Sequence, residues 1–242
     1  MTRATGMNGG GTGDRRRLLR SLVDTVIERS PWRPAPRRPV DERPRRPRPA
    51  VVLQTDIVGS TILLAAARDH YPGLLVRHRD LIGAAVRRAG GRFLTHAGDG
   101  TLAVFDRADD AIAASVDAQR ALRAERWPDG LSLRVRMGVH VGEIYEIDGE
   151  PVGLVINQGA RIMAAAEAGQ VVVSSEVVTA AAPCDAPRGG DYPFADAGWH
   201  ALRDYDRPVR LRQVVADGLT VVLPADRLID LTEPALAGTS AN

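Results

Sequence analysis

The segment AVVLQTDIVGST (residues 50–61) decides the expected fold, because an apolar run ends there in an acid and a short turn. Residues 50–55 have the apolar composition of a buried strand, and the residues from about 60 to 89 follow with helical spacing. Asp56 therefore stands where a strand leaves the sheet, directly before a Gly-Ser-Thr turn. Two interpretations are open: an acid that caps a helix, or a metal ligand beside backbone N–H groups that bind phosphate.

The composition is typical of a protein with one well-buried domain and some additional segments. The chain has 242 residues, of which 44% are hydrophobic. Its single cysteine, Cys184, excludes a disulfide framework and fits a reducing cytosol. No stretch approaches the roughly 18 apolar residues of a membrane span, and the N-terminus lacks the apolar core of a signal peptide. We therefore expect a cytoplasmic protein without a membrane partner.

The first 49 residues differ from the rest of the chain in charge. They hold 13 arginines against five acidic residues, whereas the whole chain has a net charge of +2 and no lysine. Residues 14–30 carry an apolar stripe near helical spacing, and residues 31–49 contain too many prolines for a helix or a central strand. Trp32 is the only aromatic residue of this arm, too few for base stacking. We expect a solvated linker, and nucleic acid is not an expected partner.

Helices and strands alternate after residue 50. Helices are expected at about residues 60–89, 108–125, 154–167 and 175–182, and strands at 50–55, 171–174 and 209–215. Hairpins are expected from 92–95 with 101–105 and from 131–141 with 142–147. The pattern predicts an α+β fold, with helices packed on an antiparallel-rich sheet, over residues 50–215. The arm of residues 1–49 precedes this domain, and a tail of residues 216–242 follows it, in which 219–223 could add an edge strand.

Asp99 is a second acid with a comparable position, in the tip of the first hairpin. If the two strands are neighbours, Asp56 and Asp99 lie at the same end of the sheet. Two carboxylates there hold hard divalent cations, which prefer oxygen ligands and leave positions for phosphate oxygens. The backbone N–H groups from Ile57 to Thr61, including those of Gly59 and Ser60, would then face the outer phosphates. For Asp99 the structural alternative is a turn acid.

Four blocks occur in the order TDIVGST, GGRFLTHAGDGTLAVF, LRVRMGVHVGE and GLVINQGARI. Together they resemble the class III nucleotidyl cyclase homology domain over about residues 50–215. The resemblance implies a ferredoxin-like sandwich and a head-to-tail homodimer with active sites between the two domains. Asp56 and Asp99 match the two metal-binding aspartates, and the Ile57 carbonyl matches a further ligand. Two divalent ions per site are implied, Mg²⁺ or Mn²⁺, since both suit oxygen ligands.

The same resemblance implies roles for further residues. Asn157 and Arg161 match an Asn-x-x-x-Arg pair on the partner's helix, in which the Asn orients the ribose and the Arg stabilises charge on the α-phosphate. Arg203 aligns with a lysine that meets the terminal phosphates, and Arg136, expected in the turn of the second hairpin, matches an arginine near the triphosphate. The implied reaction is attack of the ribose 3′-hydroxyl on the α-phosphorus with release of pyrophosphate.

The positions that read the base depart from the family pattern. Purine cyclases of the family have Lys and Asp where this chain has Thr95 and Glu150, and Gln54 stands where an aromatic residue is usual. Three interpretations stay open: a pyrimidine cyclase similar to those of bacterial anti-phage (Pycsar) systems, an adenylate cyclase with a divergent base pocket, and an inactive cyclase-like dimerisation module. UTP is favoured, which implies a lyase that makes cyclic UMP as a second messenger for a separate effector protein.

Overall fold

The computed structural model describes residues 46–95, 98–181, 192–203 and 205–222, which belong to one compact unit. The basic arm, with the expected helix at residues 14–30, lies outside the described residues, and so does Cys184. None of the helices within the described ranges has the length and apolar character needed to cross a bilayer.

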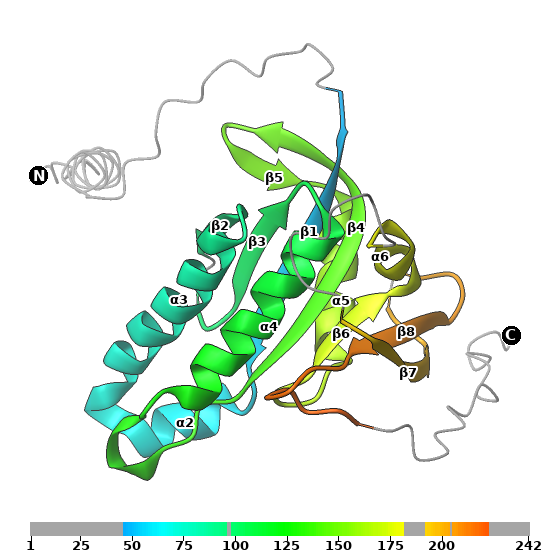
Figure 1. Cartoon of the computed structure of the whole chain (residues 1–242). Coiled ribbons are helices and arrows are strands. Elements are labelled where there is room, and N and C mark those ends of the chain that lie inside the picture. Colours follow the sequence, from blue (N-terminus) through cyan, green and yellow to red (C-terminus); the bar gives the residue numbers. More distant parts are fainter. Residues whose placement is uncertain (1–45, 96–97, 182–191, 204, 223–242) are drawn as a thin grey trace, which may run out of the picture. The chain divides into compact units, whose positions relative to one another are not determined.

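One sheet organises the fold (Figure 1). It contains eight strands, ordered β2-β3-β1-β4-β6-β8-β7, with β5 paired to the end of β4. Only β4 and β6 run parallel among the described strands, so the sheet is rich in antiparallel pairs, as expected. The strands are β1 Arg48–Ile57, β2 Arg92–Thr95, β3 Thr101–Phe105, β4 Val135–Ile147, β5 Glu150–Val152, β6 Val171–Ser174, β7 Phe194–His200 and β8 Val209–Val214.

Helices cover both faces of this sheet (Figure 1). Helices α3 and α4 pack against each other on one face, and α5 packs against β4 and β1 on the other. Side chains of β1 alternate between these layers, since Leu53 belongs to the core under α3 and α4, whereas Val52 packs with Val155 of α5. The helices are α2 Ser60–Ala67, α3 Tyr71–Arg88, α4 Ala108–Ala124, α5 Leu154–Ala164 and α6 Ser175–Ala180.

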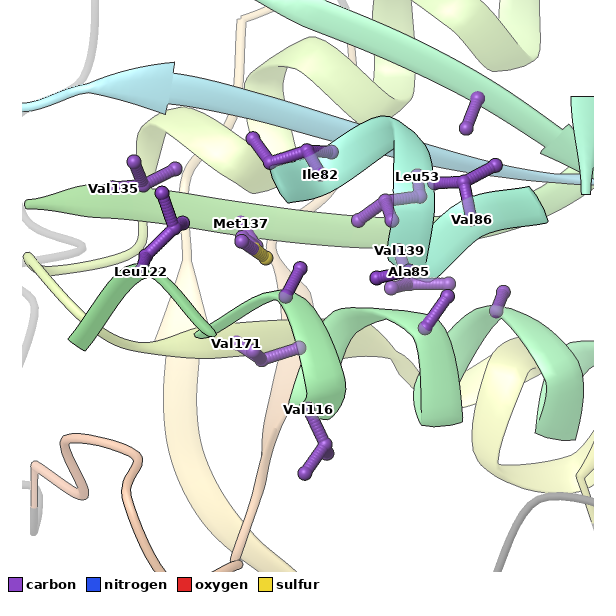
Figure 2. Packing of buried hydrophobic residues seen from close by; sticks show 14 of the residues in the cluster. Leu53, Ile82, Ala85, Val86, Val116, Leu122, Val135, Met137, Val139 and Val171 are labelled. Carbon is purple, nitrogen blue, oxygen red and sulfur yellow. The ribbon is translucent and has the colours of Figure 1, made fainter. Parts of the chain in front are cut away.

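The larger core lies between the sheet and the α3–α4 layer (Figure 2). Leu53 of β1 and Met137 of β4 pack there with Ile82 and Val86 of α3, and all four side chains are almost fully buried. Burying one such side chain stabilises a fold by about 1.5–3 kcal/mol. This layer therefore fixes β1, the strand that carries Asp56. The predicted α+β sandwich is confirmed.

The expected second hairpin is wrong, because β4 runs unbroken where a turn was predicted at residues 141–142. The turn comes later, at Asp148 and Gly149, whose φ angles are 52° and 84°. Asp-Gly with two positive φ angles is the turn that joins antiparallel strands most directly. Gly142 serves a different purpose, since a Cβ there would overlap the side chain of Val155.

The expected helix over residues 60–89 is divided in two. A short 3₁₀ turn, Arg68–His70, separates α2 from α3, and Arg68 adopts a positive φ of 46°. Pro72 lies in the first turn of α3, where its missing N–H has no consequence, whereas further inside a helix it would break a hydrogen bond. The proline therefore starts a second helix.

The far edge of the sheet also differs from expectation. Strand β7 was not predicted, and residues 219–222, the described part of the edge strand expected at 219–223, form no strand. The side-chain amide of Gln213 instead pairs with Val222 in both directions, donating to its carbonyl at 2.5 Å and accepting from its N–H at 2.9 Å. Leu219 is buried in the core. These residues of the tail are therefore packed on the domain.

Candidate active site

Asp56 lies near the C-terminal end of β1, a central strand of the sheet. Ile57 is buried in the core under α3 and α4, and the half-buried Asp56 belongs to the opposite, α5-facing side. The chain then leaves the sheet, with Val58 N–H donating to the Arg134 carbonyl at 2.9 Å. Gly59 follows with a φ of 69°, a conformation that favours glycine, and turns the chain into α2. Asp56 thus lies where β1 gives way to a helix start, as predicted.

The register of β1 and β3 brings Asp99 to the same end of the sheet. Thr55 lies opposite Thr101 in this antiparallel pair. Asp56 follows Thr55 by one residue, and Asp99 precedes Thr101 by two, so both acids lie just beyond the same end of the strand pair. The two acids therefore lie at the same end of the sheet, and the convergence of their carboxylates on one metal site stays a prediction.

The first half of α3 lies next to the turn that carries Asp99. Arg79 donates a hydrogen bond to the carbonyl of Gly98 and so holds the turn. Burial raises the pKa of Tyr71, and the negative charge of Asp99 raises it further. Burial, assisted by the charge of Arg79, lowers the pKa of His78 to about 4 against the opposing effect of Asp99. Asp99 therefore lies close to a buried, neutral imidazole.

Arg136 pairs with Asp56. The two residues lie opposite each other in the register of β4 and β1, so Arg136 is a strand residue and its predicted place in a turn is wrong. Its Nε and Nη2 atoms lie 3.0 and 2.5 Å from the same carboxylate oxygen, Oδ2. Its Nη1 lies 3.5 Å from the carbonyl of Ala164 at the end of α5. The guanidinium thus bridges the candidate metal ligand and α5.

The candidate ligands fit a divalent cation that takes most of its ligands from substrate phosphates and water. Asp56 and Asp99 are the predicted carboxylate ligands at one end of the β1–β3 pair, and the Ile57 carbonyl is the predicted third ligand. Within the described ranges, no group of three or more His, Cys, Asp and Glu side chains forms a complete metal cage. Mg²⁺ is commonly held by one or two carboxylates together with substrate phosphates and water. The residues present are therefore suitable for Mg²⁺ or Mn²⁺ with a phosphate substrate.

The segment predicted to bind phosphate follows Asp56 directly in the chain. Gly59 is the residue before α2, and Ser60 and Thr61 are the first two residues of that helix. The Leu63 N–H bonds back to the Gly59 carbonyl at 2.9 Å, which leaves the N–H groups of the preceding residues at the open end of the helix. Such a helix start attracts anions. The role predicted for these three residues stays a prediction.

Helix α5 carries Asn157 and Arg161 on one side, four residues apart. Two glycines let the helix lie unusually close to the sheet. A Cβ at Gly138 of β4 would overlap the backbone of Met163, and one at Gly159 would come within 2.9 Å of Val52. Asn157 is exposed and Arg161 is half-buried. The exposed Asn157 therefore faces solvent on this side of α5.

Side-chain hydrogen bonds, which the sequence did not indicate, fix α5 on the sheet. Gln54 of β1, predicted to contact the base, is buried and donates to the Ile156 carbonyl at 2.6 Å. His140 of β4 contacts Gln158 at 3.3 Å and Ser174 of β6 at 2.9 Å. Burial lowers the pKa of His140. A single polar residue within an apolar strand was the only available signal for either contact.

The remaining base-reading candidates lie on β2 and β5. Thr95 is the last residue of β2, and Glu150 is the exposed first residue of β5, at the far end of β4 from Asp56. Arg92 of β2 donates to the Gly149 carbonyl at 2.9 Å and pairs with Glu146 at 2.8 Å. The β4–β5 turn is therefore bound to the strand that ends at Thr95.

Arg203 lies at the other end of the sheet from Asp56. Strand β6 runs parallel to β4 and therefore starts at the Asp56 end, and β8 runs antiparallel to β6. The β7–β8 loop that contains the exposed Arg203 consequently lies at the opposite end. Asn157 also lies apart, because it precedes Ala164, the contact of Arg136, by two helical turns, or about 10 Å. The structure does not bring Asn157 or Arg203 to Asp56 within one chain.

Comparisons with known proteins identify relatives of the chain. No protein-family model matches the sequence. The chain is similar to the adenylate/guanylate cyclase/hydrolase of Silicibacter pomeroyi, with 30% identity and a TM-score of 0.57 over 71% of this chain and 99% of that one. It is 32% identical over 168 residues to an uncharacterized protein of Mycobacterium tuberculosis, covering 67% of this chain and 54% of that protein. Putative adenylate cyclase 3 of Rhizobium meliloti is 29% identical over 170 residues, which cover 69% of this chain and 28% of that protein. The chain thus spans about half or less of the length of these two curated relatives.

Proposed function

We propose, from the premise that the chain belongs to the class III adenylate/guanylate cyclase family, that it converts a nucleoside triphosphate to a 3′,5′-cyclic nucleotide and pyrophosphate. The observation that carries the proposal is the position of Asp56 and Asp99 beyond the same end of the β1–β3 pair. The start of α2, at Gly59, follows directly and offers backbone N–H groups to phosphate. Carboxylates alone would support many kinds of metal site, and the adjacent helix start favours a phosphate substrate.

The proposed chemistry needs no covalent intermediate. The 3′-oxygen of the ribose forms a bond to the α-phosphorus, its proton passes to solvent, and the bond to the β-phosphate oxygen breaks with release of pyrophosphate. Divalent ions held by Asp56, Asp99 and the Ile57 carbonyl would activate the attacking oxygen and neutralise the leaving one. Arg161 would stabilise the charge that develops on the α-phosphate, and Asn157 would orient the ribose. Interactions that strengthen in the transition state accelerate the reaction.

A second copy of the chain completes each site in this proposal. Within one chain Asn157 lies two helical turns from the contact of Arg136 with α5, and Arg203 lies at the opposite end of the sheet. A head-to-tail homodimer would place the Asn157 side of one copy opposite the Asp56 end of the other, twice, because a two-fold interface repeats each contact. Arg203 of that copy would then meet the terminal phosphates as a bidentate donor.

Two nucleotides, UTP and ATP, are the candidate substrates. Thr95 and Glu150 replace the Lys and Asp of purine cyclases, and a shorter neutral residue combined with a longer acid suits a smaller base, with UTP first. The names of the relatives, which include adenylate cyclases, support ATP as strongly as the two replaced residues support UTP. Gln54 donates to the Ile156 carbonyl, so its amide supports α5 and its proposed contact with a base would require a new hydrogen bond. For UTP the product would be cyclic UMP, a second messenger for a separate effector in anti-phage defence.

The deciding experiment offers the purified full-length chain each of the four ribonucleoside triphosphates, with Mg²⁺ and with Mn²⁺, and measures pyrophosphate and cyclic nucleotide. Asp56→Ala should abolish turnover with every nucleotide. Asp106→Ala is the matched control, because Asp106 follows the other end of β3 and pairs with Arg48 on the surface. Conversion of ATP alone would end the uridylate proposal, and no turnover with any nucleotide would support an inactive module.

A further inference from the structure

We infer that Arg136 blocks access of a metal ion to the Asp56 carboxylate in the substrate-free protein. When a triphosphate binds, Arg136 moves to the phosphate and the carboxylate becomes accessible. The inference rests on the proposed function, because it assumes that Asp56 holds a divalent ion and that Arg136 meets phosphate. It adds a coupling between the two ligands: each makes the site more accessible to the other.

The ion pair occupies the carboxylate in a specific way. Both contacts of Arg136, from Nε at 3.0 Å and from Nη2 at 2.5 Å, fall on Oδ2 of Asp56. Donation of two N–H groups to one oxygen directs the guanidinium edge across that oxygen and uses its lone pairs. A cation that binds Oδ2 at the usual distance of about 2.0–2.5 Å must displace at least one of these hydrogen bonds.

Burial makes this competition significant. The side chains of Arg136 and Asp56 are 32% and 22% exposed, so their attraction is less screened by water than that of a surface pair. The two residues are also direct cross-strand partners, so the backbone pairing of β1 and β4 keeps them close together. The charges that would meet at the site are therefore a guanidinium and a divalent ion, both drawn to one oxygen and repelling each other.

A triphosphate resolves the competition, because it gives the guanidinium another partner. Arginine forms forked, bidentate contacts with phosphate as readily as with carboxylate. The third nitrogen of Arg136, Nη1, lies 3.5 Å from the Ala164 carbonyl, so the side chain also reaches α5. If phosphate draws the guanidinium from Asp56, the freed oxygen becomes available to the ion. Linkage then requires that the ion strengthens nucleotide binding by the same factor.

The alternative is a purely structural pair that joins β1 to β4. An opposite-charge pair across two strands stabilises a sheet modestly. Under that alternative, removal of the guanidinium would loosen the Asp56 carboxylate and leave metal affinity unchanged or lower. Under the inference it would raise metal affinity in the absence of nucleotide. The two roles predict changes of opposite sign.

The first test measures Mn²⁺ binding to the full-length protein without nucleotide, from the electron paramagnetic resonance signal of free Mn²⁺. Arg136→Gln should bind Mn²⁺ about 10-fold more tightly than wild type, within the usual range of coupling between two ligands. Arg134→Gln is the matched control, because Arg134 is exposed and its guanidinium donates a hydrogen bond to the Ala168 carbonyl. It should leave Mn²⁺ affinity at the wild-type value. If Arg136→Gln fails to fold, Arg136→Lys, which lacks the fork, should tighten binding about threefold.

The second test measures nucleotide binding in EDTA by calorimetry, with UTP and with ATP. Asp56→Asn releases Arg136 for phosphate, whereas Asp99→Asn removes an equal charge from the same edge and leaves the ion pair intact. Asp56→Asn should therefore tighten binding at least about fivefold more than Asp99→Asn. Equal effects of the two variants would overturn the inference, as would Mn²⁺ affinity that is unchanged or lowered by Arg136→Gln. Mn²⁺ binding to Arg136→Gln that persists when Asp56→Ala is added would instead overturn the proposed metal site itself.

Discussion

Thr55 and Thr101 lie directly opposite each other in β1 and β3, and their hydroxyl oxygens are 2.7 Å apart in the core. Both residues are almost fully buried. This contact fixes the ends of the two strands immediately before the chain reaches Asp56 on one side and after it leaves Asp99 on the other. The geometry of the two acids thus depends on a neutral pair of threonines behind them.

Thr101→Val should destabilise the protein by about 1–3 kcal/mol, because it leaves the buried Thr55 hydroxyl without its partner. Valine has the shape of threonine, so little is lost in packing. Urea unfolding measures the change. The double variant Thr55→Val/Thr101→Val removes both polar groups and should recover most of the loss. A double variant that is less stable than either single variant would show that the hydroxyls have other essential partners.

His78 should make the stability of the fold depend on pH. Its imidazole is fully buried, and its pKa is lowered to about 4 from 6.5. As pH falls below 6.5 the unfolded chain takes up the proton and the native chain does not, so stability present above pH 6.5 is lost progressively down to about pH 4. The loss is about 1.4 kcal/mol per pH unit, or roughly 2 kcal/mol at pH 5.

His78→Leu should remove this contribution and be more resistant to mild acid than wild type. Because neither ring nitrogen has a hydrogen-bond partner among the described residues, leucine leaves no buried polar group behind. Urea unfolding at pH 7.5 and at pH 5.0 gives the free energy of unfolding that each protein loses between these two pH values, and this loss should be smaller for His78→Leu. The exposed His70, replaced by Gln, serves as control. Identical pH dependence of His78→Leu and wild type would show that the native state protonates His78 as easily as the unfolded chain.

The sequence predicted those parts of the fold in which local pattern and tertiary context agree. The hairpin of β2 and β3 was predicted to the residue, because HAGDG supplies both glycines and the acid of its turn. The position of Asp56 at the end of β1 followed from an apolar strand that ends in a glycine turn. In both places the backbone requirement of the turn selects its residues, and one sequence is then sufficient to recognise it.

The rest depended on contacts between distant segments. Gly142 resembles a turn residue, but it is a glycine because Val155 of α5 packs against it. Gln54 could be recognised as an unusual residue in an apolar strand, yet its partner is a backbone carbonyl 102 residues later in the chain. Arg136 could be assigned to phosphate by resemblance, whereas its pairing with Asp56 follows only from the β1–β4 register. Local sequence carries no record of register between strands so far apart.

Base selection should change if the two base-reading residues are replaced by those of the family pattern. Thr95→Lys combined with Glu150→Asp should raise kcat/KM for ATP relative to UTP by about 100-fold, because hydrogen-bonding residues discriminate strongly between bases. Initial rates with both nucleotides measure the ratio. Glu143→Asp, at an exposed position of β4, controls for shortening an acid in the same strand pair. An unchanged ratio would exclude Thr95 and Glu150 from base recognition.

Mixing two inactive variants should restore activity if each site draws on two chains. Asp56→Ala destroys the metal half of a site, and Asn157→Ala destroys the half that comes from the other copy. In a heterodimer of these variants one site has both defects and the other has none, so a random mixture should recover about a quarter of wild-type turnover. Co-expression with two different tags and assay of the doubly purified heterodimer removes the dependence on mixing. The mixture of Asp56→Ala with Asp99→Ala is the control, because both changes fall in the same half and every site keeps a defect. Recovered activity in that control, or no recovered activity in the mixture with Asn157→Ala, would mean that Asp56 and Asn157 do not act across a dimer interface. The distance between them within one chain would then have to close by movement of α5.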